Sequence, residues 1–404
     1  MVLIFSGCKK KDQFPLNVIS VVTEVGNYKI LNLSDYATEI RYVPLETSDL
    51  SLITYIEDIC CENEKIFIYS SFFGKSDCLL FDNNGKFCSK IGQRGQGPDD
   101  YLNLTNRLIF KNFIYLIDSH KILVYDLNCN LIENRNLQSD SSIPLEYRGE
   151  NTTGKSVPLT KDKYVIMKNT LYGYYPNAML IEFDQSNAKL IKEYPNYVKV
   201  DKKPPGIYGE EQGIMYHFQD EVRFYRAIND TIFSISQNTE IKDAFIFDLG
   251  KYKTPLALTR EDNLVRLTES KFIQPLKIIE SNTYLFVNIN FGIHTPEPYV
   301  SINRLGNPMQ NANVYGIFDK LTGKLTLMRQ PIKGKLGFKN DIDNGPVIWP
   351  HYISTNNELV TYISVTEFME YYKKIDNPSP QLTAVANQID MDDNQIVIIA
   401  KLKE

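Results

Sequence analysis

Short apolar runs separated by polar turns recur along most of the chain. The runs are rich in β-branched and aromatic residues, and Asn, Asp, Gly and Lys border them, which is typical of strands joined by turns. Helical periodicity is nearly absent before residue 366. The clearest apolar runs are 66–69, 78–81, 113–117, 122–125, 164–167 and 178–183. The pattern therefore predicts an all-β chain.

One local motif repeats within this pattern. An aromatic residue followed by Asp ends a strand, and a polar turn then leads to another strand. The motif begins at Phe81, Tyr125, Phe183 and Phe318, with a degenerate copy at Phe233. Asp accepts hydrogen bonds from the backbone just after it, which favours turns, whereas calcium loops need a regular ligand spacing and a distal bidentate Glu. Several strands in each long repeat indicate β-propeller blades.

The repeats predict a six-bladed propeller. The last blade lacks an obvious fourth strand, and the strand-like segment 40–46 has no blade of its own. We expect segment 40–46 to complete the last blade, because this closure leaves no open sheet edge. Segment 366–390 has the pattern of two short helices, broken at 377–380, that cap this blade or dock a partner. The expected blades are about 55–92, 106–137, 160–195, 214–249, 272–330 and 348–401.

The first eight residues resemble the end of a bacterial lipoprotein signal peptide. An apolar stretch leads to Ser6 and Gly7 just before Cys8, which would be the lipidated residue. A complete signal peptide also has a charged start and a longer apolar run, so an upstream start stays open. The sequence assigns 1–8 to a partial signal peptide, 9–25 to a flexible tether and 26–404 to the propeller.

Several motifs together resemble a known family. They are Tyr42-Val-Pro-Leu-Glu-Thr47, Leu52-Ile53, Phe81-Asp-x-x-Gly-Lys86, Ile91-Gly-Gln-Arg-Gly-Gln-Gly-Pro-Asp-Asp-Tyr101 and Arg226-x-x-Asn-Asp-Thr-Ile-Phe233. These motifs resemble the six-bladed β-propeller lipoproteins of Bacteroides and relatives, which are similar to NHL-repeat propellers. Asp99 and Asp100 replace the Gly-Glu that the family usually has before Tyr101. The resemblance spans roughly 26–404 and implies the fold and an envelope location, but no activity.

Charge and composition narrow the class of protein. Lys and Arg number 44 against 49 Asp and Glu, with the two signs intermixed, which argues against nucleic-acid binding. Because no run of 18 apolar residues exists, a lipid is the only membrane attachment expected. With a lipid on Cys8 and the envelope location that the resemblance implies, we expect the protein at the outer membrane, on its periplasmic or its surface face. Cys78 and Cys88 lie on adjacent predicted strands; we expect free thiols, and a disulfide stays open.

Catalytic and cofactor motifs are absent from the sequence. It contains no Gly-x-Ser-x-Gly elbow, and none of the four His residues has zinc-protease spacing. Gly92, Gly95 and Gly97 lack the Lys-Ser/Thr and the helix start of a phosphate loop. We therefore expect no cofactor, no metal and no catalytic residue. The alternative is a carbohydrate-active enzyme, which needs two carboxylates about 5–10 Å apart at the channel mouth.

Loop lengths suggest where a ligand binds. Long connections fall on one face of the predicted disc, and long loops on a rigid scaffold often bind ligands. We expect a monomer that binds a glycan, a peptide or an envelope protein on this face. Arg94 and Gln96 either form a connection between blades or reach the channel mouth. The candidate ligand-binding residues are Arg94, Gln96, Tyr172, Tyr174, Tyr175, Arg226, His294, Arg304, Trp349 and His351.

Overall fold

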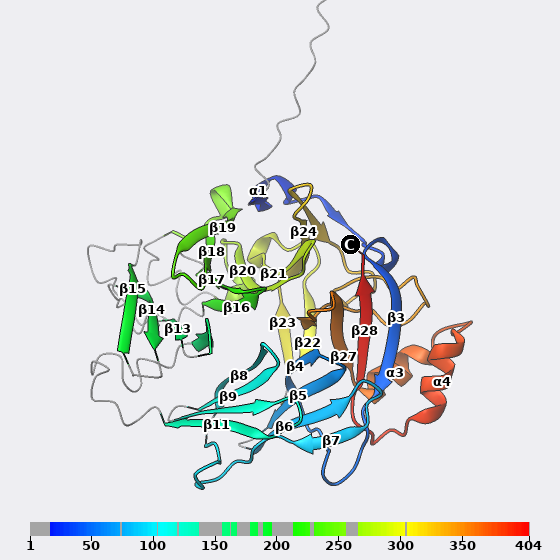
Figure 1. Cartoon of the computed structure of the whole chain (residues 1–404). Coiled ribbons are helices and arrows are strands. Elements are labelled where there is room, and N and C mark those ends of the chain that lie inside the picture. The colour runs from blue at the N-terminus through cyan, green and yellow to red at the C-terminus, as the bar shows by residue number, and fades with distance from the viewer. Residues whose placement is uncertain are drawn as a thin grey trace, which may run out of the picture.

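The chain folds as an all-β propeller with few helices, as the computed structural model shows (Figure 1). Within the described residues, no helix is long and apolar enough to cross a membrane. The structure describes residues 17–72, 75–102, 104–118, 121–136, 156–161, 163–167, 178–184, 189–195, 213–226, 230–255, 266–303 and 305–403.

The first sheets follow one another along the chain, each with antiparallel neighbours in sequence order. The β4–β7 sheet contains β4 (Ile56–Glu62), β5 (Lys65–Phe72), β6 (Lys75–Asp82) and β7 (Phe87–Lys90). The β8–β11 sheet contains β8 (Leu104–Phe110), β9 (Phe113–Asp118), β10 (Lys121–Asp126) and β11 (Leu131–Asn136). The β12–β15 sheet contains β12 (Ser156–Pro158), β13 (Lys163–Met167), β14 (Ala178–Asp184) and β15 (Lys189–Pro195).

The remaining sheets use the C-terminal half and an N-terminal strand. The β16–β19 sheet contains β16 (Ile214–Phe218), β17 (Glu221–Tyr225), β18 (Thr231–Ile235) and β19 (Ile241–Asp248). The β20–β25 sheet contains β20 (Gln274–Glu280), β21 (Tyr284–Asn290), β24 (Asn313–Asp319) and β25 (Lys324–Met328), and a separate hairpin pairs β22 (Tyr299–Ile302) with β23 (Pro308–Asn311). The seam sheet contains β26 (Tyr352–Ile353), β27 (Glu358–Ile363), β28 (Ile396–Leu402) and β3 (Ala37–Pro44).

The two ends of the chain meet in the seam sheet. β3 pairs antiparallel with β28, from Pro44 opposite Ile396 to Ala37 opposite Leu402. Val43, Val397 and Ile399 are buried at this contact and pack toward the β4–β7 sheet. The outer edge of β28 is therefore paired with the N-terminal segment instead of being left open.

Two helices lie between β27 and β28 of the seam sheet. α3 (Val365–Tyr372) and α4 (Pro380–Gln388) each begin after a serine whose side chain accepts a backbone N–H bond. Such caps satisfy the free N–H groups of a first turn, and Pro suits the first helical position. Phe368 and Leu382 are buried in the same cluster as Tyr42, so the helices cover the outer side of β3 (Figure 1).

The segment before β3 lies along the outer edges of two sheets. β1 (Val18–Ser20) pairs parallel with β19, and β2 (Tyr28–Lys29) pairs parallel with β25, with the short helix α1 (Val21–Glu24) near β1. Ile19 and Val21 are fully buried there. Residues 17–25 therefore belong to the folded domain, which corrects the expected tether of 9–25. The apolar side chains of this segment, Val18, Ile19, Val21 and Val22, have sheet edges to cover, and their burial accounts for the order of a segment that follows polar residues.

The repeated Asp residues close turns, as the sequence predicts. Asp82 Oδ1 accepts hydrogen bonds from the backbone N–H groups of Asn84 and Lys86, both at 2.9 Å. Asp126 and Asp319 accept equivalent bonds in their own turns. The turn after Asp184 lies outside the described residues.

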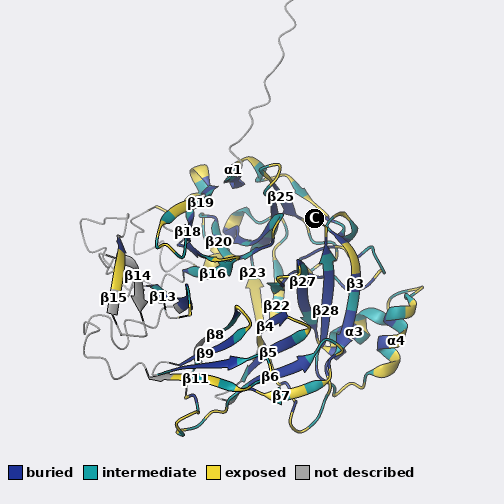
Figure 2. Cartoon of the chain, viewed as in Figure 1, coloured by how far each residue is buried: buried dark blue, intermediate teal, exposed yellow. Residues whose placement is uncertain are grey.

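Consecutive residues are buried along the middle strands of several sheets (Figure 2). Both faces of these strands therefore pack against neighbouring sheets. Cys78 is buried on β6 and Cys88 is exposed on β7, and no disulfide joins the cysteines that the structure describes. Leu80 pairs with Ser89 and Phe81 with Phe87, so the register between β6 and β7 skips Cys88. Cys88 is therefore not opposite Cys78.

Candidate functional site

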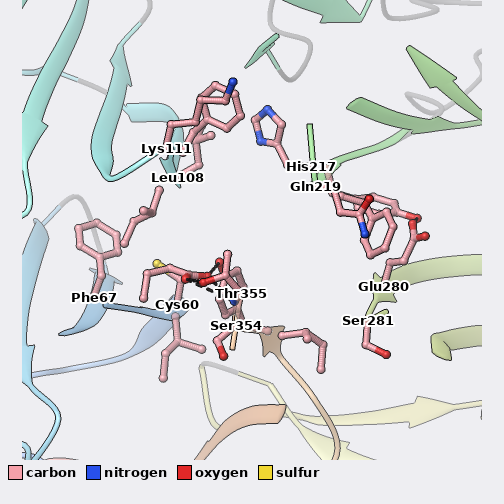
Figure 3. Close-up of a pocket in the computed structure, with 18 of the residues that line it drawn as sticks. Cys60, Phe67, Leu108, Lys111, His217, Gln219, Glu280, Ser281, Ser354 and Thr355 are labelled. Carbon is pink, nitrogen blue, oxygen red and sulfur yellow. Dashed lines mark hydrogen bonds between the residues drawn. The ribbon is translucent and has the colours of Figure 1, made fainter. Parts of the chain in front are cut away.

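A cavity of about 700 Å³ lies where the innermost strands end (Figure 3). β4, β8, β12, β16, β20 and β26 all contribute to its wall, together with the turns that follow five of them. These turns join first to second strands and are short, whereas the long connections leave the opposite ends of the strands. The cavity therefore lies at the short-turn end of the channel, and its volume is typical of small-molecule sites.

Carboxamides from four sheets form the rim of the cavity. Asn63, Asn112, Gln219 and Asn282 line it and are exposed. Asn63 and Asn112 have φ angles of 50° and 65°, which two-residue hairpin turns require and which Asn tolerates well. Asn63 Nδ2 donates to Asn112 Oδ1 at 2.7 Å, so the turns of adjacent sheets are linked. Such a rim offers donors and acceptors without net charge.

The deeper wall is largely apolar. Cys60, Phe67, Val157 and Met215 are buried and line the cavity, and Leu108 lies beside Phe67 in the close-up (Figure 3). An apolar wall with a polar rim suits a ligand that buries one part and hydrogen-bonds with another.

A stacked pair connects the β8–β11 sheet to the β16–β19 sheet across the short strand β12. The rings of Phe110 and His217 are 4.3 Å apart at 14°. His217 Nε2 donates to the carbonyl oxygen of Pro158, because that oxygen can only accept. Burial lowers the pKa of His217 to about 4. At neutral pH the ring is therefore uncharged, with Nδ1 as an acceptor.

One carboxylate of the wall belongs to an ion-pair network. Glu280 is buried; its Oε2 lies 3.1 Å from Arg223 Nε, and its Oε1 lies 2.7 Å from Lys320 Nζ. The Tyr216 hydroxyl also donates to Oε2 at 3.0 Å. Burial, reinforced by Glu280, raises the pKa of Tyr216 well above its ordinary value, so the phenol remains a donor. The network joins the β16–β19 and β20–β25 sheets beside the cavity.

A second carboxylate of the wall has neutral partners alone among the residues that the structure describes. Glu62 is 5% exposed, and its Oε1 accepts hydrogen bonds from the Tyr352 hydroxyl at 2.6 Å and the Thr355 amide at 3.0 Å. The Thr355 hydroxyl donates to Oε2. Burial raises the pKa of Tyr352 well above its ordinary value, with Cys60 and Glu62 adding to the effect, so this phenol also remains protonated. Glu62 is thus fixed at the junction of β4 and the β26–β27 turn.

The lowered pKa of Glu221, which lies next to the Glu280 network, should make the free energy of unfolding depend on pH. Burial alone would raise its pKa, but hydrogen bonds from Lys242, Ser234 and Arg223 lower it from 4.5 to about 2. A lowered pKa stabilises the fold above the ordinary pKa, and this contribution is lost as pH falls through the folded value. We expect the wild type to lose more stability than Glu221→Gln between pH 5 and about 2, in urea titrations at each pH. Parallel curves for the two proteins would contradict this assignment.

The Gly-rich segment forms a connection between sheets, which was one of the two interpretations of its sequence. Arg94 and Gln96 are exposed on the segment between β7 and β8, and Arg94 Nε donates to the Leu102 carbonyl at 3.0 Å. Tyr101 is buried, and its hydroxyl donates to the Ser76 carbonyl at 3.0 Å. Tyr101 therefore packs between the β4–β7 and β8–β11 sheets.

The other described candidates lie before a first strand or after a second strand, away from the cavity. Trp349 is buried and stacks on Tyr315 with the rings 4.5 Å apart. Arg226 is only 1% exposed. His294 Nε2 lies 3.1 Å from the carbonyl oxygen of Lys271. His351 is exposed, and its Nδ1 lies 2.8 Å from the hydroxyl of Thr361. None of the six described candidates lines the cavity. The candidates Cys8, Tyr172, Tyr174, Tyr175 and Arg304 lie outside the described residues.

The cavity residues carried a signal that the sequence analysis missed. A carboxamide follows or nearly follows the first strand of four repeats, as Asn63, Asn112, Gln219 and Asn282. Alignment of the repeats on their first turn, rather than on the Asp turn after the third strand, would reveal this. Among the described residues, no group of three or more His, Cys, Asp or Glu side chains could hold a metal ion.

Solved structures of low sequence identity share the fold. A candidate exported protein from Bacteroides fragilis is 19% identical, with a TM-score of 0.63, 96% of this chain and 100% of that chain covered. A member of the DUF4221 family from Bacteroides vulgatus is 13% identical, with a TM-score of 0.51, 91% of this chain and 97% of that chain covered. No curated protein matches the chain. The model of a domain of unknown function, DUF4934, matches residues 16–401, so the chain belongs to that family.

Proposed function

We propose that the protein is a non-catalytic binding protein whose ligand occupies the central cavity. The observation that carries this proposal is the cavity of about 700 Å³, with an apolar wall and a rim of carboxamides from four sheets. Glycans and peptides both combine apolar surface with many hydrogen-bonding groups, so both remain candidate ligands. This places the site at the opposite end of the channel from the long loops.

The ring that holds this cavity is proposed to have six blades, in the manner of the NHL-like lipoproteins. The pairing of β3 with β28 supports this arrangement, as does the contribution of an innermost strand from each four- or five-stranded sheet to the cavity. A ring of this kind holds the rim residues on rigid hairpins. The α3–α4 pair is then an insertion in the last blade.

The location is proposed to be the bacterial envelope, with a lipid on Cys8 as the anchor to the outer membrane. The small residues before Cys8 support lipidation, and the candidate exported protein of similar fold is consistent with export. The protein is proposed to act as a monomer. Its mixed surface charge does not favour nucleic acid as a partner.

A ligand screen by thermal shift on the full chain tests the proposal. At a hundred times its dissociation constant, a ligand stabilises the native state by about 2.7 kcal/mol. Asn282→Trp places a bulky ring on the rim, and we expect it to abolish the shift produced by glycan or peptide hits. Leu321→Trp is the control, because Leu321 is 74% exposed in another short turn outside the cavity. Hits that both variants bind equally would mean that the ligand site lies elsewhere.

The alternative is a carbohydrate-active enzyme, and one observation bears on it. Glu62 and Glu280 both line the cavity, as a glycosidase would require of its carboxylates. However, Arg223, Lys320 and Tyr216 occupy the oxygens of Glu280, which leaves it poorly placed to pass a proton to a leaving group. Release of reducing sugar by the wild type, lost in Glu280→Gln, would support the enzyme and refute the binding protein.

A further inference from the structure

The charges around the cavity are balanced except at Glu62. Glu280 is neutralised by Arg223 and Lys320. Asp58 lies 3.8 Å from Arg107, and Asp220, just outside the wall, lies 3.2 Å from Lys111. Glu62 is the exception among the acidic side chains that line the cavity, because its described partners are Tyr352 and Thr355, both neutral.

A buried carboxylate with neutral donors alone leaves a negative charge uncompensated. Burying a charge is costly unless an opposite charge or a metal accompanies it. The donors to this carboxylate among the described residues are two hydroxyls and one amide, which is shared between Oε1 at 3.0 Å and Oε2 at 3.3 Å. None of the three donors carries a positive charge. Because Glu62 lines the cavity, a cation in the cavity can pair with it.

The two basic residues of the wall are already engaged. Arg107 bonds Glu57 at 3.2 Å, and its guanidinium lies 4.0 Å from the centre of the Tyr69 ring. Lys111 pairs with Asp220 near the opening. Neither is held against Glu62 by an ion pair of the described residues. The missing positive charge is thus not supplied by these side chains.

The rest of the wall suits an organic cation better than a hydrated metal ion. Phe67 and Tyr352 line the cavity together with Glu62, and aromatic rings attract ammonium groups through their faces. The neutral His217 adds an acceptor without adding positive charge. Apolar side chains beside a carboxylate that has no cationic partner suit an amine that carries an aliphatic or aromatic group.

We infer that the cavity binds a ligand bearing a primary ammonium group, with Glu62 as its counter-ion. This inference rests on the proposed function, which places the ligand in the cavity. The ammonium group pairs with the Glu62 carboxylate, and the apolar part of the ligand lies against Phe67 and Leu108. Thr355 and Tyr352 act as positioning residues that hold the carboxylate.

Calorimetry on the full chain with matched small probes tests the inference. 2-Phenylethylamine and 2-phenylethanol have nearly the same shape and differ in charge at pH 7. We expect the amine to bind the wild type at least about tenfold more tightly than the alcohol, a difference of about 1.4 kcal/mol. In Glu62→Gln, which keeps the size of the side chain, we expect this preference to disappear.

Two further variants separate the role of the charge from the folding of the site. Tyr352→Phe removes a donor but leaves the carboxylate, so the amine should still be preferred. Asn282→Trp should reduce the binding of both probes, because it obstructs the rim. If Glu62→Gln fails to fold, judged by circular dichroism, Glu62→Asp takes its place: it keeps the charge but withdraws the carboxylate, and it should weaken the binding of the amine more than that of the alcohol.

The outcomes distinguish the inference from the function on which it rests. If the alcohol binds as tightly as the amine and Asn282→Trp blocks both, the inference is wrong and the cavity is still a binding site. If the amine is preferred but Glu62→Gln retains that preference, the counter-ion is not Glu62 and the inference is also wrong. If neither probe binds and the glycan and peptide screen is equally blank, the proposed function fails as well.

Discussion

Glu280→Gln is expected to lower the free energy of unfolding by about 3–5 kcal/mol, because it removes the anion that lies between the largely buried side chains of Arg223 and Lys320. Arg223 and Lys320 have side chains that are 8% and 14% exposed, and both contact Glu280 directly. Glu221 still pairs with Arg223, but Lys320 has no other ion pair among the described residues. Urea denaturation followed by far-ultraviolet circular dichroism measures the loss.

Two comparisons make this expectation specific to the buried network. Asp77→Asn breaks the exposed pair with Lys90, whose side chains are 43% and 42% exposed, and should cost less than about 1 kcal/mol. Adding Lys320→Met to Glu280→Gln should recover part of the loss, since it removes one unpaired cation. Equal losses in Glu280→Gln and Asp77→Asn would show that the network contributes no more than a surface pair.

The architecture was accessible from the sequence because propeller sheets are built from local hairpins. The Asp turns at Asp82, Asp126 and Asp319 bond the backbone just as their spacing predicts. The pairing of segment 40–46 with the last sheet followed from one missing strand, and β3 does pair with β28, starting earlier at Ala37. The edge strands β1 and β2 were missed, because three- and two-residue strands carry no periodicity to detect.

The cavity was not accessible by the same reasoning. Long loops and aromatic residues directed attention to positions such as Trp349 and Arg226, yet both are buried in the packing between elements. A cavity formed by six innermost strands depends on their relative placement, which no single repeat encodes. The cationic partners of Glu280 come from β17 and from the turn after β24, far from it in sequence. The sequence alone therefore cannot show that Glu280 has cationic partners and that Glu62 has neutral ones.

Gly85→Ala is expected to destabilise the fold by at least about 4 kcal/mol, at the place where the ring is closed. Gly85 has a φ of +85°, and a Cβ there would lie 2.1 Å from the carbonyl oxygen of Pro44, the last residue of β3. The Gly85 carbonyl also accepts a hydrogen bond from the Glu46 amide at 2.8 Å. Relief of the clash therefore requires either the β6–β7 turn or the end of β3 to move.

Gly334→Ala separates the clash from the cost of the backbone conformation. Gly334 has a φ of +84°, nearly the same as Gly85, but a Cβ there would meet no atom within 4 Å. Only the conformational strain of about 1–2 kcal/mol should appear in this variant. The difference between the two variants in urea denaturation thus measures how rigidly the end of β3 is held against the β4–β7 sheet. If the two losses are equal, the end of β3 yields at little cost, and the closure of the ring depends on the β3–β28 pairing rather than on this turn.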